Sequence, residues 1–340
     1  MKALKYIFFL LLIFIIGFAI YIAVQPNDFS FERHKVINAP AEVVYQTVNE
    51  FKEWPRFSPW LEQDTLAKIT YGERTSGSQA NYSWNGDILG VGSMTTLQTV
   101  ENASIDQRID FVEPFETSSN VNWSFEPQAN GTKVTWSMSG EQDFMTKMYV
   151  AFKGTIEENT GPNFERGLFK LDSIVQSDMK QFSVDVEGIT QHSGGFYLYN
   201  TTSCRMSDFK EKMQEMMPRI GGYAISNNIK MAGVPFVIYH KWDEANDAVI
   251  FSCCIPTSSK MTSTEPDILT GQLEPFKTVK TVLTGDYENL KTAWEETMTY
   301  IEENNLVLID AGPKIEMYLT DPISTPNPAQ WKTEIYLAVE

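Results

Sequence analysis

Two stretches of the C-terminal half are near-copies of one another, and this duplication constrains the fold more than any other feature of the chain. The first copy comprises residues 233–240 (GVPFVIYH) and 251–256 (FSCCIP), and the second comprises residues 312–319 (GPKIEMYL) and 333–338 (TEIYLA). Both copies have the apolar, β-branched and aromatic composition of paired strands. A repeat of this kind predicts two equivalent structural units.

Helical and strand patterns extend both copies to the same order of elements. From residue 184 onwards, each copy contains a strand, an amphipathic helix and two further strands. The first copy has these elements at 188–199, 207–220, 235–240 and 248–255, and the second has them at 278–284, 289–304, 314–319 and 333–339. We therefore expect a pseudo-twofold domain with a groove between its halves.

One position breaks the duplication. Tyr239 and Tyr318 occupy equivalent positions in the two copies. Two residues before each tyrosine, the first copy has Val237 and the second has Glu316. A carboxylate in an otherwise apolar strand is costly unless something pairs with it. Glu316 is therefore the best indicator of what this protein handles.

Strand geometry predicts which side chains surround Glu316. Because alternate residues of a strand share a face, Glu316 and Tyr318 lie together, and the twofold brings Tyr239 toward them. The residues expected on the other face, toward the helix of the repeat, are Ile315, Met317 and Leu319. We also expect Tyr336 and Trp331 nearby. Aromatic faces attract a cation by about 0.5–2 kcal/mol each, and a partly buried carboxylate adds the counter-charge, so this set suits a cationic or polarised apolar ligand.

The N-terminus contains an uncharged apolar run of 18 residues, 7–24. At about 1.5 Å per residue, a helix of this length spans a bilayer core. A cleaved signal peptide is the alternative, although residues 21–26 (YIAVQP) offer no small-x-small cleavage site. Basic residues precede the run and acidic residues follow it, so the positive-inside rule predicts a single-pass cell-membrane protein with a cytoplasmic N-terminus and extracytoplasmic domains.

Residues 28–183 are expected to form an α+β domain of the helix-grip type. A strand at 29–36 is followed by a helix that begins after 38–40 (NAP), and a helix from 161 to about 184 closes the region. Between them lie strand-like stretches at 79–84, 93–100, 107–112, 118–126 and 132–139. One strand, one helix, a run of antiparallel strands and a long closing helix define this arrangement.

Three segments of this region resemble a known superfamily. They are residues 31–45 (FERHKVINAPAEVVY), the loop 54–60 (WPRFSPW) and residues 164–171 (FERGLFKL). Together they are similar to the SRPBCC superfamily of START-like and polyketide cyclase-like domains. The resemblance implies an apolar cavity between the sheet and the long helix. In the alternative interpretation, the aromatic residues fill an ordinary core.

Residues 184–340 resemble the GyrI-like effector-binding domains, which also occur in transcription activators. The likeness rests on residues 285–290 (GDYENL), Trp294, 300–305 (YIEENN), 316–322 (EMYLTDP) and 331–336 (WKTEIY). The resemblance implies that Glu316 lies in the ligand pocket. The sequence shows no helix-turn-helix pattern, which disfavours a role in transcription.

The role of Glu316 has two further interpretations. The resemblance also implies a hydrolase of small electrophilic compounds, in which Glu316 acts as a base or positions water beside Tyr318, Tyr239 and Trp331. Burial among aromatic residues would raise the pKa of its carboxyl group toward a range that suits a general base. In the other interpretation Glu316 has no functional role and is either solvated on the sheet face or paired with Lys314.

Charge and residue spacing exclude several classes of function. A formal net charge of -17 argues against a nucleic-acid partner, because phosphate binding needs clustered Lys and Arg. The three histidines, His34, His192 and His240, lack the spacing of metal ligands, so we expect no metal site and no cofactor. The three cysteines indicate no disulfide framework.

The sequence thus predicts a transmembrane anchor at 1–27, a START-like domain at 28–183 and a GyrI-like domain at 184–340. The predicted function is membrane-anchored binding of a small apolar, cationic or lipid-like compound in a C-terminal pocket. The predicted ligand-binding residues are Glu316, Tyr318, Tyr239, Tyr336 and Trp331. A purely structural interaction module would be favoured if side chains filled both cavities.

Overall fold

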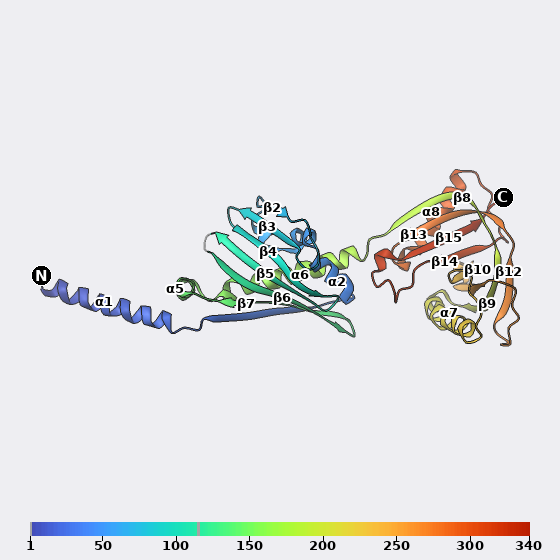
Figure 1. The fold of residues 1–340 in the computed structure, drawn as a ribbon. Coiled ribbons are helices and arrows are strands. Elements are labelled where there is room, and N and C mark those ends of the chain that lie inside the picture. The colour runs from blue at the N-terminus through green and yellow to red at the C-terminus, as the bar shows by residue number, and fades with distance from the viewer. Residues whose placement is uncertain (1, 114–115) are drawn as a thin grey trace. The chain divides into compact units, whose positions relative to one another are not determined.

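The computed structural model describes residues 2–113 and 116–340 (Figure 1). Contacts divide the chain into two compact units, unit 1 up to Asp178 and unit 2 from Met179 to Glu340. Each unit combines one antiparallel sheet with helices. The expected α+β class is confirmed, and so is the strand-helix-strand-strand order of both copies, as β9-α7-β10-β11 and β13-α8-β14-β15.

Unit 1 contains a seven-stranded antiparallel sheet in the order β1-β7-β6-β5-β4-β3-β2. The strands are β1 (Asp28–Ile37), β2 (Lys68–Tyr71), β3 (Asn81–Gly86), β4 (Gly90–Val100), β5 (Ser104–Glu113), β6 (Thr117–Gln128) and β7 (Gly131–Glu141). The helices are α1 (Lys2–Ala23), α2 (Ala41–Asn49), α3 (Trp54–Phe57), α4 (Pro59–Gln63), α5 (Phe144–Lys153) and α6 (Ile156–Asp178). The first strand therefore pairs with the last, and the long helix α6 follows them.

Alternating burial explains how α6 packs against this sheet. On β6, Val121, Trp123 and Phe125 are buried, whereas the residues between them are more exposed. An apolar stripe of α6 packs on the same side of the sheet through Phe164. Gly167 permits the close approach of the helix, because a Cβ atom there would lie 2.7 Å from the ring of Trp136. The helix-grip expectation is confirmed for this unit.

Helix α1 is long and apolar enough to cross a membrane over residues 4–23, and its residues are mostly exposed. Its length and composition suit a membrane anchor and a signal sequence alike. Helix α5 was not expected from the sequence, and α6 begins about five residues earlier than expected.

Unit 2 contains an eight-stranded antiparallel sheet in the order β12-β9-β11-β10-β14-β15-β13-β8. The strands are β8 (Ser183–His192), β9 (Gly195–Cys204), β10 (Phe236–Asp243), β11 (Ala248–Thr257), β12 (Leu269–Leu273), β13 (Phe276–Thr284), β14 (Lys314–Tyr318) and β15 (Lys332–Ala338). The helices are α7 (Phe209–Ser226) and α8 (Leu290–Glu303), with short 3-10 turns between elements. Both helices pack against the same face of the sheet.

The strand order of unit 2 is symmetric about its centre. Strands β9, β11 and β10 of the first copy are mirrored by β13, β15 and β14 of the second. The two copies meet where β10 pairs with β14, and Val237 lies directly opposite Glu316 in that pair. The position that breaks the duplication therefore lies at the pseudo-twofold axis.

The expectation of a single strand at 188–199 is wrong. The chain turns between β8 and β9 at Gly194 and Gly195, which have φ values of 71° and 135°. Residues other than glycine rarely adopt this left-handed backbone, so the glycine pair makes a tight turn there. Strand β12 was also missed, because residues 269–273 (LTGQL) are short and have a glycine at their centre.

Candidate functional site

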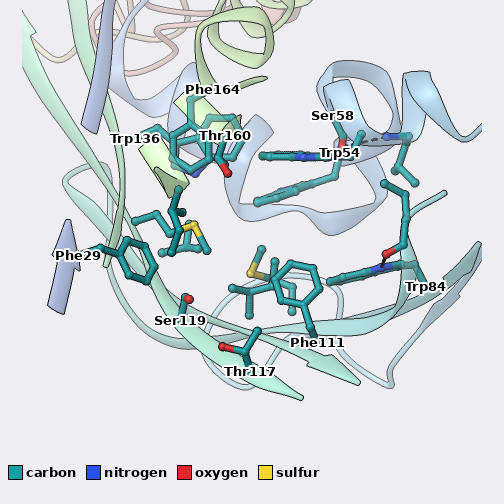
Figure 2. A pocket seen from close by; sticks show the side chains of 18 of the residues that line it. Phe29, Trp54, Ser58, Trp84, Phe111, Thr117, Ser119, Trp136, Thr160 and Phe164 are labelled. Carbon is teal, nitrogen blue, oxygen red and sulfur yellow. Dashed lines mark hydrogen bonds between the residues drawn. The ribbon is translucent and has the colours of Figure 1, made fainter. Parts of the chain in front are cut away.

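Unit 1 encloses a cavity of about 260 Å³ between the sheet and α6 (Figure 2). An apolar cavity of about 150 Å³ is already large enough to bind benzene. Eight aromatic side chains line the cavity: Phe29, Trp54, Trp60, Tyr82, Trp84, Phe111, Trp136 and Phe164. Both alternatives for the aromatic residues therefore hold in part, since these residues form a core and leave a cavity inside it.

Trp136 lies at the centre of the aromatic packing. Its ring stacks between Trp123 and Phe164, with centroid distances of 4.2 and 4.1 Å. Trp54 closes another side, and its indole N–H donates to the carbonyl of Val48 at 2.8 Å. Trp136 is buried, and its own Nε1 has no hydrogen-bond partner among the described residues.

The polar residues that the strands contribute to the cavity lining gather at one end of the sheet. Glu141 and Thr117 are exposed, and both line the cavity. Ser119 pairs with Gly140, and Glu141 pairs with Asp28, so all these residues lie at the end of the sheet where β1 begins. The cavity therefore meets solvent at the end where the chain arrives from α1.

Unit 2 holds Glu316 in a cluster of three donors. Tyr239 and Tyr318 donate their hydroxyl protons to Oε2 at 2.8 and 2.7 Å. Trp294 of α8 donates its indole N–H to Oε1 at 2.5 Å. Each carboxylate oxygen is thus satisfied, and all three donors are neutral.

Burial dominates the electrostatics of this cluster. Glu316 is 2% exposed, and its burial raises the pKa of the carboxyl group although the three donors act in the opposite direction. Burial first, and then the nearby carboxylate, raises the pKa of Tyr239 and Tyr318 well above the ordinary value of 10.0. Both phenols therefore keep their protons at neutral pH.

Glu316 is covered by the helices rather than exposed in a groove. Trp294 lies over it from α8, and the hydroxyl of Tyr318 lies 3.6 Å from the sulfur of Met213 on α7. A ligand can therefore reach the carboxylate only if α7 and α8 move apart. Among the described residues, only neutral donors contact this buried carboxyl group.

The structure brings together three of the five residues predicted for this site. Glu316, Tyr318 and Tyr239 are in direct contact. Trp331 does not touch this group directly but is separated from it by Tyr287, whose ring lies 4.7 Å from the ring of Trp331. Tyr287 in turn contacts Tyr318 at 5.4 Å.

Two parts of the prediction are wrong. Tyr336 pairs with Ile315 on the other face of the sheet, where its hydroxyl donates to Glu334 at 2.7 Å. Ile315 and Met317 also pack on that face, so the helices cover the Glu316 face and not, as expected, the face of these apolar residues. Strand alternation shows which residues share a face but does not show which face a helix covers.

The structure also excludes the two interpretations in which Glu316 has no functional role. Glu316 is neither solvated nor paired with Lys314, whose ammonium donates to the carbonyl of Asp310. The partners that the sequence analysis missed are Trp294 and Tyr287. Trp294 carried a signal, because a tryptophan in an amphipathic helix with a buried neighbour usually finds an acceptor for its N–H.

Family models match both units. Residues 37–169 match the family described as polyketide cyclase / dehydrase and lipid transport, and residues 196–340 match the GyrI-like small molecule binding domain. The suspected pairing of an SRPBCC-type domain with a GyrI-like domain is confirmed, and both are small-molecule-binding families. Comparison with curated proteins gave no match.

Several solved structures are similar to parts of the chain. The crystal structure of the EcmrR C-terminal domain is 17% identical, covers 47% of this chain and 98% of its own, and has a TM-score of 0.40. EcmrR in complex with DNA is 16% identical over 59% of this chain and 86% of its own, with a TM-score of 0.41. A protein from Chromobacterium violaceum is 15% identical over 43% of this chain and 96% of its own, with a TM-score of 0.34.

Proposed function

We propose that this chain, which joins a polyketide cyclase-like domain to a GyrI-like small-molecule-binding domain, binds an apolar small molecule in the cavity of unit 1. The observation that carries the proposal is the aromatic cavity of about 260 Å³ between the sheet and α6. Ligand sites are typically concave and apolar, with few polar groups that fix orientation. The predicted C-terminal pocket becomes a second candidate, because Glu316 is enclosed.

Two lining residues narrow the class of ligand. Glu141 is exposed at the open end of the cavity, so its negative charge disfavours an anionic head group there. Trp136 has an N–H without an acceptor among the described residues, and an uncharged ligand oxygen would satisfy it. The ligand that fits best is neutral or cationic, largely apolar, and carries a hydrogen-bond acceptor.

A pair of serines gives a matched test of this site. Ser119 is buried and lines the cavity, whereas its neighbour Ser118 is exposed on the other face of β6. Ser119→Phe places a ring in the cavity, and Ser118→Phe places the same ring in solvent. The full chain in nanodiscs would be titrated with the neutral dye N-phenyl-1-naphthylamine, following energy transfer from tryptophan.

The saturable part of the energy transfer should be kept in Ser118→Phe and lost in Ser119→Phe. Partition of the dye into the disc is the same for both variants, so it cancels. Equal saturable binding in the two variants would exclude the cavity as the ligand site.

A second function is favoured by the buried carboxyl group of Glu316, which is held by neutral donors alone among the described residues. We propose that opening between α7 and α8 admits a cationic aromatic compound, which would pair with the carboxylate and contact the tyrosine rings. The probe is tetraphenylphosphonium, with neutral triphenylphosphine oxide as its control. A thermal shift that is specific for the cation and absent in Glu316→Gln supports the site.

The hydrolase interpretation uses the same residue and is tested in the same variant. Styrene oxide is a suitable strained electrophile, and its turnover by the parent protein but not by Glu316→Gln would favour general-base catalysis. No turnover by the parent, together with cation binding, leaves Glu316 as a counter-ion only.

The location of the protein is also a proposal. We infer that α1 stays uncleaved and anchors the protein in the membrane, and that both domains lie outside the cytoplasm. The proposed boundaries are 1–27 for the anchor, 28–183 for the first domain and 184–340 for the second. A net charge of -17 continues to argue against a nucleic-acid partner. Membrane fractionation and protease accessibility of intact cells test this: full-length protein that stays soluble, or domains that resist external protease, would contradict it.

A further inference from the structure

Helix α5 presents an apolar stripe to its surroundings rather than to the core of unit 1. Phe144, Met148 and Phe152 recur every four residues, and Met145 and Tyr149 lie beside them on the same side. Phe144, Met145, Tyr149 and Phe152 are 46%, 55%, 55% and 72% exposed. A short helix with several large apolar side chains exposed on one side indicates an interaction surface.

Hydrogen bonds fix α5 beside the end of α1. Lys147 is buried on the inner side of α5, and its ammonium donates to the carbonyl of Gln25 at 2.6 Å and to Oδ1 of Asn27 at 2.5 Å. The ring of Phe152 lies 5.5 Å from the ring of Phe18 in α1. The exposed stripe is therefore continuous with the apolar surface of α1.

The contact with Phe18 indicates how deep α5 would lie in the membrane. Phe18 precedes Ala23, the last residue of the span, by five positions. At about 1.5 Å per residue, this is about 7.5 Å inside the apolar segment. Amphipathic helices that lie in a membrane interface bury their apolar face to about 5–10 Å, so Phe152 lies at the depth expected for such a helix.

The same end of unit 1 contains the opening of the cavity. Thr146 of α5 lines the cavity from the inner side of this helix. Glu141, an exposed residue of the lining, pairs with Asp28 at the start of β1. The end of α1, the stripe of α5 and the opening of the cavity therefore adjoin one another within unit 1.

We propose that α5 docks on the surface of the lipid bilayer beside α1, and that the cavity exchanges its apolar ligand directly with the bilayer. This inference rests on the proposed membrane anchor and extends the proposed function of the cavity. Burial of the exposed stripe in the interface drives docking, because it removes four large apolar side chains from water.

The charges around α5 indicate which kind of lipid surface this helix can bind. Asp143 precedes the helix and Glu158 follows it closely, while Lys153 is the basic residue of its last turn. Glu157 also follows the helix, but its carboxylate pairs with Arg33. An anionic bilayer would repel this acidic surround. The surface that fits is one of zwitterionic lipid, and insertion depends on the apolar stripe rather than on charge.

Adjacent positions of α5 provide the test. The full chain would be placed in phosphatidylcholine nanodiscs, with the half-buried Cys204 replaced by serine and with Phe152→Cys or Lys153→Cys labelled by a polarity-sensitive nitrobenzoxadiazole dye. Cys253 and Cys254 are buried and stay unlabelled. Lipids with a nitroxide near the head of the acyl chain should quench the dye at position 152 at least threefold more strongly than at position 153.

A second position in the apolar stripe controls for the possibility that Phe152→Cys itself weakens docking. Met145→Cys keeps Phe152 in place and should be quenched like position 152. Equal quenching at 152, 145 and 153, or none at any of them, would overturn docking. A chain that leaves the discs would overturn the anchor and docking together.

Dye binding to the cavity in the same discs separates this inference from the proposed function. Selective quenching without saturable dye binding supports docking and contradicts the cavity as a ligand site. Saturable dye binding with equal quenching supports the cavity and contradicts docking. Phe152→Asp should slow the transfer of the dye from disc to cavity at least fivefold, and an unchanged rate would contradict exchange through the bilayer.

Discussion

Removal of one hydroxyl from the Glu316 cluster should destabilise unit 2 in a way that depends on pH. In Tyr318→Phe, Oε2 of Glu316 loses a donor at 2.7 Å but keeps Tyr239 at 2.8 Å. A hydrogen bond to a charged group contributes about 1.5–3 kcal/mol, and the remaining donor limits the loss to about 1.5 kcal/mol. We expect the larger cost at pH 8, where more of the carboxyl groups are ionised than at pH 4.5.

The sign of the pH effect follows from burial. The pKa of Glu316 in the folded protein lies above its ordinary value of 4.5, because burial disfavours the charged form. At pH 4.5 more than half of the folded molecules therefore carry a protonated carboxyl group, which needs fewer donors. The cost of Tyr318→Phe should shrink as the pH falls from 8 to 4.5.

Hydrogen exchange of the full chain measures this cost within unit 2. About 1.4 kcal/mol corresponds to a factor of ten, so the slowest amides of β14 and α8 should exchange about tenfold faster in the variant at pH 8. Tyr336→Phe is the matched control, because that hydroxyl also donates to a carboxylate at 2.7 Å, but to Glu334, which is partly exposed and paired with Lys280.

The control should cost about 0.5–1 kcal/mol, in the range of an ordinary hydrogen bond, with little dependence on pH. An equal cost of Tyr318→Phe at both pH values, or a cost no larger than that of Tyr336→Phe, would contradict a buried carboxylate that depends on this hydroxyl.

Three further predictions follow from the packing. Glu316→Gln should remove the loss of stability that the raised pKa imposes as the pH rises above 4.5, so the difference in unfolding free energy between parent and variant should fall with pH; a constant difference would contradict the raised pKa. Trp136→Ala should cost unit 1 about 3–5 kcal/mol in denaturant unfolding, and a cost under about 1 kcal/mol would contradict the stacked core. Lys147→Met should speed amide exchange in α5 but not in β6, and equal effects in both would show that the lysine does not hold α5 specifically.

The sequence predicted the architecture of unit 2 because its duplication left few alternatives. Equivalent tyrosines placed Tyr239 and Tyr318 beside Glu316, and the structure confirms this. The sequence pointed to the wrong face for the helices, since the apolar residues Ile315 and Met317 lie on the face of β14 that the helices leave uncovered. Tyr336 was misplaced because the pairing register, which sets Ile335 and not Tyr336 opposite Glu316, cannot be read from either strand alone. Trp294 was missed because its contact crosses from a helix to the sheet.

The same limit applies to unit 1. Alternation and the closing helix predicted the helix-grip fold, but the volume left between the aromatic rings depends on their packing, which no sequence pattern encodes. Helix α5 was missed because its apolar stripe faces outward, whereas the patterns used to find helices assume that an apolar stripe faces the core.

Photo-crosslinking tests the central claim most directly, because it identifies the unit that holds the ligand. The full chain in nanodiscs would be irradiated with a neutral diazirine-labelled monoacylglycerol, and the modified peptides would be located by mass spectrometry. We expect crosslinks on β5, β6, β7 and α6 around the cavity, with competition by unlabelled lipid and loss in Ser119→Phe. Crosslinks confined to unit 2, or unchanged by Ser119→Phe, would contradict it.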